Sequence, residues 1–281
     1  MKSAALSRLG GRALWLLPLA GAALYFVAVR LLGGDGDRSG FYFGEALITK
    51  SAALIACITA AMRFERGDRM RTIWLLFVTD FALLLTKELV VHPAAGALLS
   101  HSMVLWLRAI CLIGANAAGT FAWIVLARTW RVAGLTLDSS PATQRALVFV
   151  AIAAGIALVG WGTMSDVRSL LAGHFAYAIN VLSDAADVIG FALAAPVALT
   201  AWTLRGGSLS WPYVYLTACT FTWMLFDVAQ ALRGTTGAAR SIEELLRIIA
   251  CSLHVSAAVA TRWAVRRPSA AIQPRKEQLS A

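Results

Sequence analysis

Eight stretches of about 20 mostly apolar residues recur along the chain, and this repetition constrains the fold more than any other feature. A helix needs roughly 20 such residues to cross the hydrocarbon of a membrane. We therefore expect an all-α integral membrane protein with eight transmembrane helices. The predicted spans are Ala13–Leu32, Gly44–Met62, Thr72–Val91, Val104–Ala127, Ala146–Met164, Tyr177–Leu204, Pro212–Leu232 and Leu245–Val265.

The composition excludes a soluble fold. Apolar residues make up 59% and charged residues 14% of the 281 residues, whereas a soluble domain carries roughly 45–50% and about 25%. The net charge of +10 could suggest nucleic acid, but the basic residues lie in short clusters between apolar stretches, as loop charges do. We therefore expect the lipid bilayer as the surroundings and no nucleic-acid partner.

The loop charges predict the orientation, because Lys and Arg gather on the cytoplasmic side. The third-to-fourth connection, from Val91 to Met103, has no basic residue, so we place it outside and both termini in the cytoplasm of a bacterial-type inner membrane. The basic clusters on the cytoplasmic side are Lys2, Arg8 and Arg12; Arg63, Arg66, Arg69 and Arg71; Arg128, Arg131 and Arg145; and Arg262, Arg266, Arg267, Arg275 and Lys276.

Both ends of the chain carry a further expectation. Basic residues before the first span resemble those of a cleaved signal peptide, but the apolar stretch is long for one, so we expect a retained span. Residues 268–281 are short and polar, and we expect a disordered cytoplasmic tail.

A shift of 139 positions aligns the two halves of the chain without a gap. It places Glu45 on Asp184, Glu88 on Asp227 and Arg108 on Arg247, and it also aligns Arg66-Gly67 with Arg205-Gly206 and Arg128 with Arg267. Charged residues are rare in membrane helices, so their agreement in one register favours duplication. We predict two parallel four-helix units, residues 1–139 and 140–267, with the Arg-Gly pair ending the second helix of each unit.

The repeated charges form two predicted clusters near the outer ends of their helices: Glu45, Glu88 and Arg108 in the first unit, and Asp184, Asp227 and Arg247 in the second. An arginine can bridge two carboxylates through its planar fork. One interpretation is a structural clamp that ties helices two, three and four of each unit together. The other is a polar vestibule that opens to the outer face.

Polar residues that differ between the halves are better guides to function, since a clamp required by the fold should occur in both. Asp80 lies near the middle of its span and shares a helical face with Lys87, seven residues on. Asp184 and Asp187 share a face with Asn180. The candidate binding or ion-coupling residues are therefore Asp80, Lys87, Asp184, Asp187 and His254, with Lys50 and Asn116 as further unmatched polar residues.

No cofactor is predicted. The four cysteines, Cys57, Cys111, Cys219 and Cys251, lie inside apolar stretches without CxxC spacing, which is typical of small core residues. Haem would need two facing histidines at membrane depth and retinal a lysine in a late span, and the sequence offers neither. His92, His101 and His174 lie near outer loops, where a metal site with Glu88 is a weaker alternative.

Three classes of function stay open, since no phosphate-binding loop or hydrolase motif occurs. The first is a small-solute or ion transporter or channel with a polar site opening to the outer face. The second is a sensory or assembly module that binds a ligand, a membrane-protein partner or a second copy through its outer charges. The third is a membrane-embedded enzyme for a lipid-linked substrate, with Glu88 or Asp227 as the acid.

Overall fold

Eight long helices make up most of the chain, and no strand occurs in the part that the computed structural model describes, residues 11–32, 39–96, 98–132, 141–203, 210–232 and 238–265. The predicted tail, residues 268–281, lies outside these ranges. The long helices are α2 (Leu16–Leu31), α3 (Ser39–Ala61), α4 (Arg69–Val91), α6 (His101–Val132), α7 (Pro141–Leu171), α8 (Ala178–Thr203), α9 (Ser210–Ala231) and α10 (Ala238–Ala264). The short α5 (Pro93–Gly96) and the 3₁₀ helix η1 (Phe175–Tyr177) join them.

Each predicted span coincides with one long helix, so the all-helical prediction is confirmed for the described residues. Six of the eight are long and apolar enough to cross a membrane: α2, α3, α6, α7, α8 and α10. The other two, α4 and α9, do not meet these criteria of length, hydropathy and charge. The reason in α4 is its charge: Asp80, Lys87 and Glu88 lie in the span. In α9, serine, threonine and tyrosine dilute the apolar residues.

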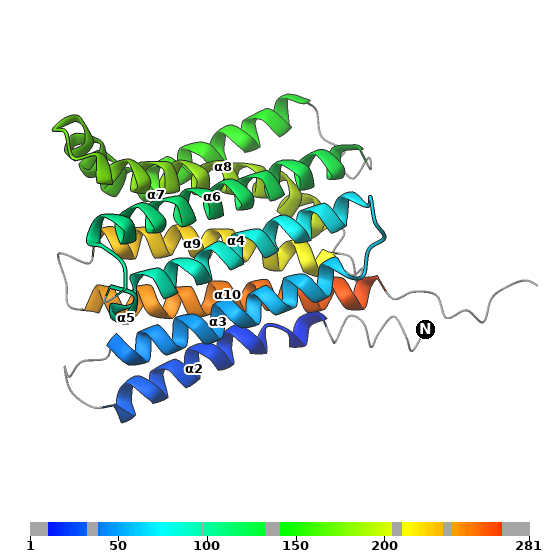
Figure 1. The fold of residues 1–281 in the computed structure, drawn as a ribbon. Helices are drawn as coiled ribbons and strands as arrows, with labels where there is room; N and C mark the ends of the chain where they lie inside the picture. The colour runs from blue at the N-terminus through cyan, green and yellow to red at the C-terminus, as the bar shows by residue number, and fades with distance from the viewer. Residues whose placement is uncertain are drawn as a thin grey trace, which may run out of the picture.

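Six of the helices close into a ring. Going round it, α3 packs on α4, α4 on α6, α6 on α8, α8 on α9, α9 on α10, and α10 again on α3 (Figure 1). The other two long helices lie outside the ring, with α2 against α10 and α7 against α8 and α9. Only 17% of the apolar window of α2 and of α7 is buried, against 67% for α10. The six ring helices therefore enclose the interior of the bundle, and α2 and α7 pack against the outside of the ring.

The two ends of the ring differ. We call the end where α2 begins and α10 ends the proximal end, and the end that carries α5 the distal end (Figure 1). The proximal half is a dry apolar core that includes Trp74, Leu126 and Tyr215, each at most 1% exposed. Aromatic contacts extend it, since the ring centroids of Trp130 and Tyr213 lie 4.2 Å apart.

The turn between α3 and α4 corrects one prediction. Gly67 has a φ of +92°, which glycine adopts without the steric cost of a Cβ. It lies six residues after the end of α3, directly before Asp68, whose carboxylate accepts a hydrogen bond from the Met70 amide at 2.7 Å. Gly67 therefore shapes the approach to the α4 N-cap and does not end α3. The aligned pair, Arg205-Gly206, lies outside the described residues.

Candidate functional site: a charged cavity in the distal half

A cavity of about 930 Å³ lies inside the ring, on the distal side of the apolar core. All six ring helices line it, and α7 closes one side. Its deepest wall includes Phe77, Trp123 and His254, and its outermost wall includes Val91 and Asp166 near helix ends. The site thus runs from the distal end to about the middle of the bundle.

Charge is concentrated on this wall. Eight of the chain's 15 acidic residues line the cavity: Asp80, Glu88, Asp166, Asp184, Asp187, Asp227, Glu243 and Glu244. Five basic residues join them: Lys50, Lys87, Arg108, Arg240 and Arg247. An ionised group in a membrane interior costs several kcal/mol unless it is paired or hydrated. Which of these groups are paired therefore decides what the cavity can bind.

Two ion-pair clusters lie at the distal end. In the first, Glu88 of α4 pairs with Lys50 of α3 and with Lys87, whose Nζ lies 2.6 Å from the Glu88 Oε1. This cluster joins two neighbouring ring helices and leaves one positive charge in excess.

In the second cluster, Arg247 of α10 pairs with Glu45 of α3 and with Glu244 on its own helix. Its Nη2 also donates to the Tyr42 carbonyl at 3.2 Å. Two carboxylates share one guanidinium, so this cluster has one negative charge in excess.

These pairs correct the predicted clamp within each half. Arg247 does not join Asp184 and Asp227 of its own unit, and it contacts Glu45 of the other unit. Arg108 pairs with neither Glu45 nor Glu88. Its side chain is exposed at the distal rim and makes no ion pair with the described residues. The physical reason is the ring, which brings α10 against α3 and so makes the contacts between units.

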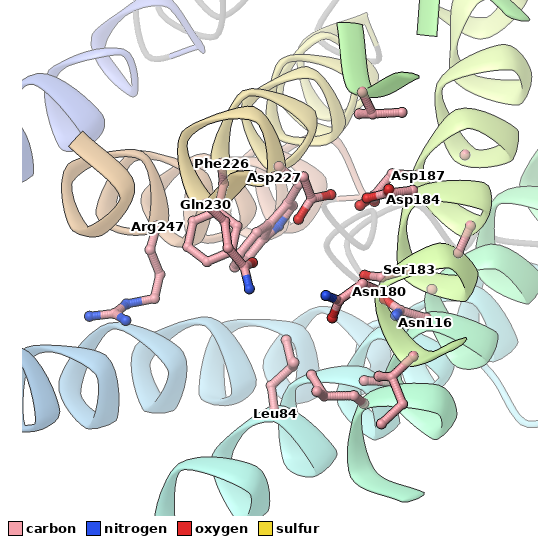
Figure 2. Close-up of a pocket in the computed structure, with 18 of the residues that line it drawn as sticks. Leu84, Asn116, Asn180, Ser183, Asp184, Asp187, Phe226, Asp227, Gln230 and Arg247 are labelled. Carbon is pink, nitrogen blue, oxygen red and sulfur yellow. The ribbon is translucent and has the colours of Figure 1, made fainter. Parts of the chain in front are cut away.

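Four aspartates form the deeper acidic part of the cavity: Asp80, Asp184, Asp187 and Asp227, here called the acidic group. None of them makes an ion pair with Lys or Arg within the described residues. Figure 2 shows the Asp227 carboxyl from α9 directed toward Asp184 and Asp187 of α8. The acidic group therefore presents carboxyl oxygens to the cavity, and no lysine or arginine of the described residues forms an ion pair with them.

The contacts of each aspartate are specific. The Asp187 and Asp227 carboxyls lie close enough to interact with each other. Asp184 accepts a hydrogen bond from the Thr163 hydroxyl of α7. Asp80 lies beside Gly119 of α6, where an added Cβ would come 3.5 Å from its Oδ2.

His254 closes the deep end of the cavity. Its Nδ1 lies 2.9 Å from the Cys219 Sγ, and its ring meets the edges of Phe77 and Phe81 with centroids 4.8 Å apart. The side chain is only 5% exposed, and its Nε2 has no hydrogen-bond partner. A buried imidazole nitrogen on a cavity wall is thus free to bind a solute or a water.

Aromatic side chains complete the wall. Trp123 of α6, Trp161 of α7, and Trp223 and Phe226 of α9 all line the cavity. An aromatic face attracts a cation within about 6 Å of its centroid, most strongly on tryptophan. The wall therefore combines two chemistries that suit positive charge, the carboxylates and the aromatic faces.

The structure places all five sequence-predicted candidates, Asp80, Lys87, Asp184, Asp187 and His254, on the wall of this one cavity. Lys87 forms an ion pair with Glu88, whereas the other four candidates form no ion pair with another described residue. Of the residues grouped as structural charges, Asp227, Glu88, Arg108 and Arg247 also line the cavity, and Glu45 does not.

Several lining residues were not predicted from the sequence. Thr163, Gly119 and the tryptophans are common in membrane helices, so nothing in their type marks a site. Asp227 was assigned from the sequence to a structural cluster with Asp184 and Arg247, whereas the structure places it on the cavity wall with Asp184 and Asp187.

The described residues hold no group of three or more His, Cys, Asp and Glu side chains that could bind a metal ion. His92 stacks instead on Phe43, with centroids 4.1 Å apart. All four cysteines are free and buried. Comparison of the chain with protein families, with curated proteins and with solved structures gives no match, so the site itself must carry the functional argument.

Proposed function

We propose that this protein is a multi-pass membrane transporter that takes up a small organic cation from the outer face into the distal cavity. The observation that carries the proposal is the acidic group, which lines a cavity within a membrane bundle and has no lysine or arginine partner in the described chain. A bound cation would supply the missing charge, which a low-dielectric site otherwise lacks.

The size and lining of the cavity favour an organic cation over a bare ion. Small-molecule sites typically measure about 300–1,000 Å³, and this cavity of about 930 Å³ falls in that range. A metal ion would need several ligands converging at about 2–2.6 Å, and no such group occurs in the residues described. Trp123 and Trp223 offer faces that suit an ammonium group.

The proposal includes eight spans in two parallel four-helix units. The contacts of the ring support this: pairs α3–α4, α4–α6 and α6–α8 correspond to α8–α9, α9–α10 and α10–α3 when one unit is placed on the other. The two long helices that do not meet the criteria for a span, α4 and α9, are then the equivalent third helices of the two units. Both are in the ring, where their polar residues line the cavity instead of meeting lipid.

The proposal also keeps the predicted orientation, with both termini in the cytoplasm. The distal end is then the outer face, and the cavity opens toward it. The apolar core of the proximal half separates the cavity from the cytoplasm. Transport would therefore require the two units to move relative to each other about the site, as in other transporters built from repeats.

A binding and uptake experiment tests the proposal. The purified full chain in lipid nanodiscs is titrated with choline, tetramethylammonium and propylammonium, and with 3,3-dimethylbutanol, the uncharged isostere of choline. Tryptophan fluorescence reports binding, since three tryptophans line the cavity. We expect the cations to bind and the isostere not to bind. Equal binding of choline and its isostere, or no binding of any cation, would overturn the proposal.

Transport is tested separately with radiolabelled choline in proteoliposomes. We expect uptake with the wild-type chain and at least tenfold less with Asp187→Asn. The control is Glu65→Gln, which neutralises an exposed carboxylate in the proximal turn outside the cavity.

A sensory module is the second candidate, and the apolar proximal core favours it. Aromatic and aliphatic side chains fill that half of the ring and leave the cavity as a site with access from one side. A sensor would bind choline in nanodiscs but show no uptake in proteoliposomes, and it would co-purify with a membrane-protein partner. Binding with uptake excludes this alternative.

A further inference from the structure

We propose that His254 recognises a hydroxyl group on the transported cation, so that the substrate is an amino alcohol. Its ammonium would lie at the acidic group, and its hydroxyl would donate a hydrogen bond to the His254 Nε2 at the deep wall of the cavity. This inference rests on the proposed function and narrows its substrate class. His254 is then the residue that distinguishes an amino alcohol from other organic cations of similar size.

The hydrogen bonds around Cys219 determine which nitrogen of His254 carries a hydrogen. The Cys219 Sγ lies 3.2 Å from the Ala250 carbonyl oxygen, which can only accept, so the thiol donates its single hydrogen there. The same sulfur lies 2.9 Å from the His254 Nδ1. Because the thiol hydrogen is already in use, the sulfur is the acceptor in this second contact and Nδ1–H is the donor.

The surroundings of His254 favour a neutral imidazole. Its side chain is 5% exposed and forms no ion pair with another described residue. An unpaired charge costs far more to bury than a neutral polar group. A neutral imidazole carries a hydrogen on one nitrogen only, so with Nδ1 protonated the Nε2 presents a lone pair.

This Nε2 is an acceptor that the protein leaves without a donor. The atom is buried and has no hydrogen-bond partner, and His254 lines the deep end of the cavity. A buried acceptor without a donor is unfavourable, and a water or a ligand relieves it only by donating a hydrogen bond. The deep wall therefore favours a ligand that carries an O–H or N–H group.

The neighbours of His254 favour a hydroxyl over a second ammonium group. Phe77 and Phe81, at 2% and 0% exposure, contact the imidazole with ring centroids 4.8 Å away. Apolar surroundings of this kind disfavour a charge. A charged N–H also forms its stronger hydrogen bonds with carboxylates, which the acidic group supplies. A hydroxyl is the neutral donor that suits the remaining acceptor.

The two recognition points lie close enough for one small molecule. Asp80 lies within one helical turn of both Phe77 and Phe81 on α4, so its level in the bundle is close to that of the His254 ring. The other members of the acidic group reach the same cavity from α8 and α9 (Figure 2). A short alkyl chain can therefore join an ammonium at the carboxylates to a hydroxyl at Nε2.

A comparison of two ligands tests the inference on the wild-type chain. The full chain in nanodiscs is titrated with choline and with (2-fluoroethyl)trimethylammonium, in which fluorine replaces the hydroxyl. The two cations share their charge and nearly their size, but only choline can donate a hydrogen bond. We expect choline to bind at least about tenfold more tightly, because a site that hydrogen-bonds a hydroxyl rejects an analogue without one.

Two variants test the assignment to His254. His254→Gln places an amide near the position of Nε2 and should keep part of the preference for choline. His254→Asn reaches only to the position of Nδ1, so it should bind the two cations equally. The fluoro analogue does not use Nε2, so its affinity should stay within about twofold of wild type in both variants. Thermal unfolding checks that each variant is folded.

Nitrogen NMR of the wild-type chain with labelled histidine gives a readout that needs no folded variant at His254. The resonance of a lone-pair nitrogen moves when the nitrogen accepts a hydrogen bond. The His254 Nε2 resonance should therefore shift on addition of choline and stay in place with the fluoro analogue.

The outcomes separate the two proposals. Equal binding of choline and the fluoro analogue by the wild type would overturn recognition of the hydroxyl and leave the organic-cation site standing. An undiminished preference for choline in His254→Asn, or an unmoved Nε2 resonance with choline bound, would overturn the role of His254. Failure of the wild type to bind any cation, tetramethylammonium included, would overturn the proposed function itself.

Discussion

Lys50 of α3 donates a hydrogen bond to Glu88 of α4, and both side chains are buried, at 3% and 8% exposure. Lys50 is placed near the middle of its helix, and its ammonium reaches Glu88 in the last turn of α4. The carboxylate of Glu88 is therefore what makes a charge tolerable at that depth, and the pair fixes α3 against α4.

Replacing Lys50 by methionine should destabilise the fold by about 2 kcal/mol, because it removes a buried charge-assisted hydrogen bond and leaves Glu88 paired only with the more exposed Lys87. Lys87→Met should cost less, since Lys87 is 21% exposed and Glu88 keeps Lys50. Thermal unfolding in detergent compares the two variants. Equal losses of stability in the two variants would show that the burial of each lysine does not determine how much its ion pair with Glu88 contributes.

Asp80→Asn should weaken choline binding at least tenfold without lowering the unfolding temperature. Asp80 makes no ion pair in the described chain, so its neutralisation removes a buried charge and breaks no contact of that kind. Fluorescence titration and thermal unfolding measure the two effects, with Glu65→Gln as the matched carboxylate control. A large loss of stability would instead indicate that Asp80 has a structural partner.

Gly162→Ala should destabilise the contact between α7 and α9 by about 1–3 kcal/mol, as overpacking does. An added Cβ at Gly162 would come 2.8 Å from the Cβ of Ala231, and neither atom can rotate away. Gly160→Ala is the control on the same helix, where the nearest atom would be 3.9 Å away. That variant should be neutral or gain up to about 1 kcal/mol from helix propensity.

Introduced cysteines can report the orientation, because the four native thiols are buried and should label slowly. Leu98→Cys lies at the distal end, where the leucine is 86% exposed, and Arg66→Cys lies in the exposed proximal turn. A membrane-impermeant maleimide should label only Leu98→Cys in intact cells and both variants after permeabilisation. The reverse pattern would place the cavity on the cytoplasmic side.

The positions of the helices could be predicted from the sequence, because the apolar stretches that mark them consist of residues close together in the chain. The ends of α6 and α7 extend past the predicted Ala127 and Met164 to Val132 and Leu171, since polar residues beyond the hydrocarbon continue a helix without adding hydropathy. Asp80 could likewise be selected, because a carboxylate near the middle of a span is rare.

The partners of the charges could not be predicted in the same way. A repeat register shows that Arg108 and Arg247 are equivalent in sequence, but it does not say which helices become neighbours. Arg247 pairs with Glu45 because α10 packs on α3. Arg108 has no ion-pair partner among the described residues, although α6 packs on α8. Interhelical contacts depend on the whole ring, so equal positions acquired unequal surroundings.

The contact between α3 and α10 therefore includes an ion pair, whereas the contact between α6 and α8 includes none among the described residues. Parting α10 from α3 must break the ion pair of Arg247 with Glu45 and its hydrogen bond to the Tyr42 carbonyl. Separating α6 from α8 breaks no ion pair among the described residues, and a Cβ added at Gly190 would still lie 3.5 Å from the Trp123 ring. For the transport proposed above, we therefore expect the two units to separate first between α6 and α8, while the ion pair holds α10 against α3.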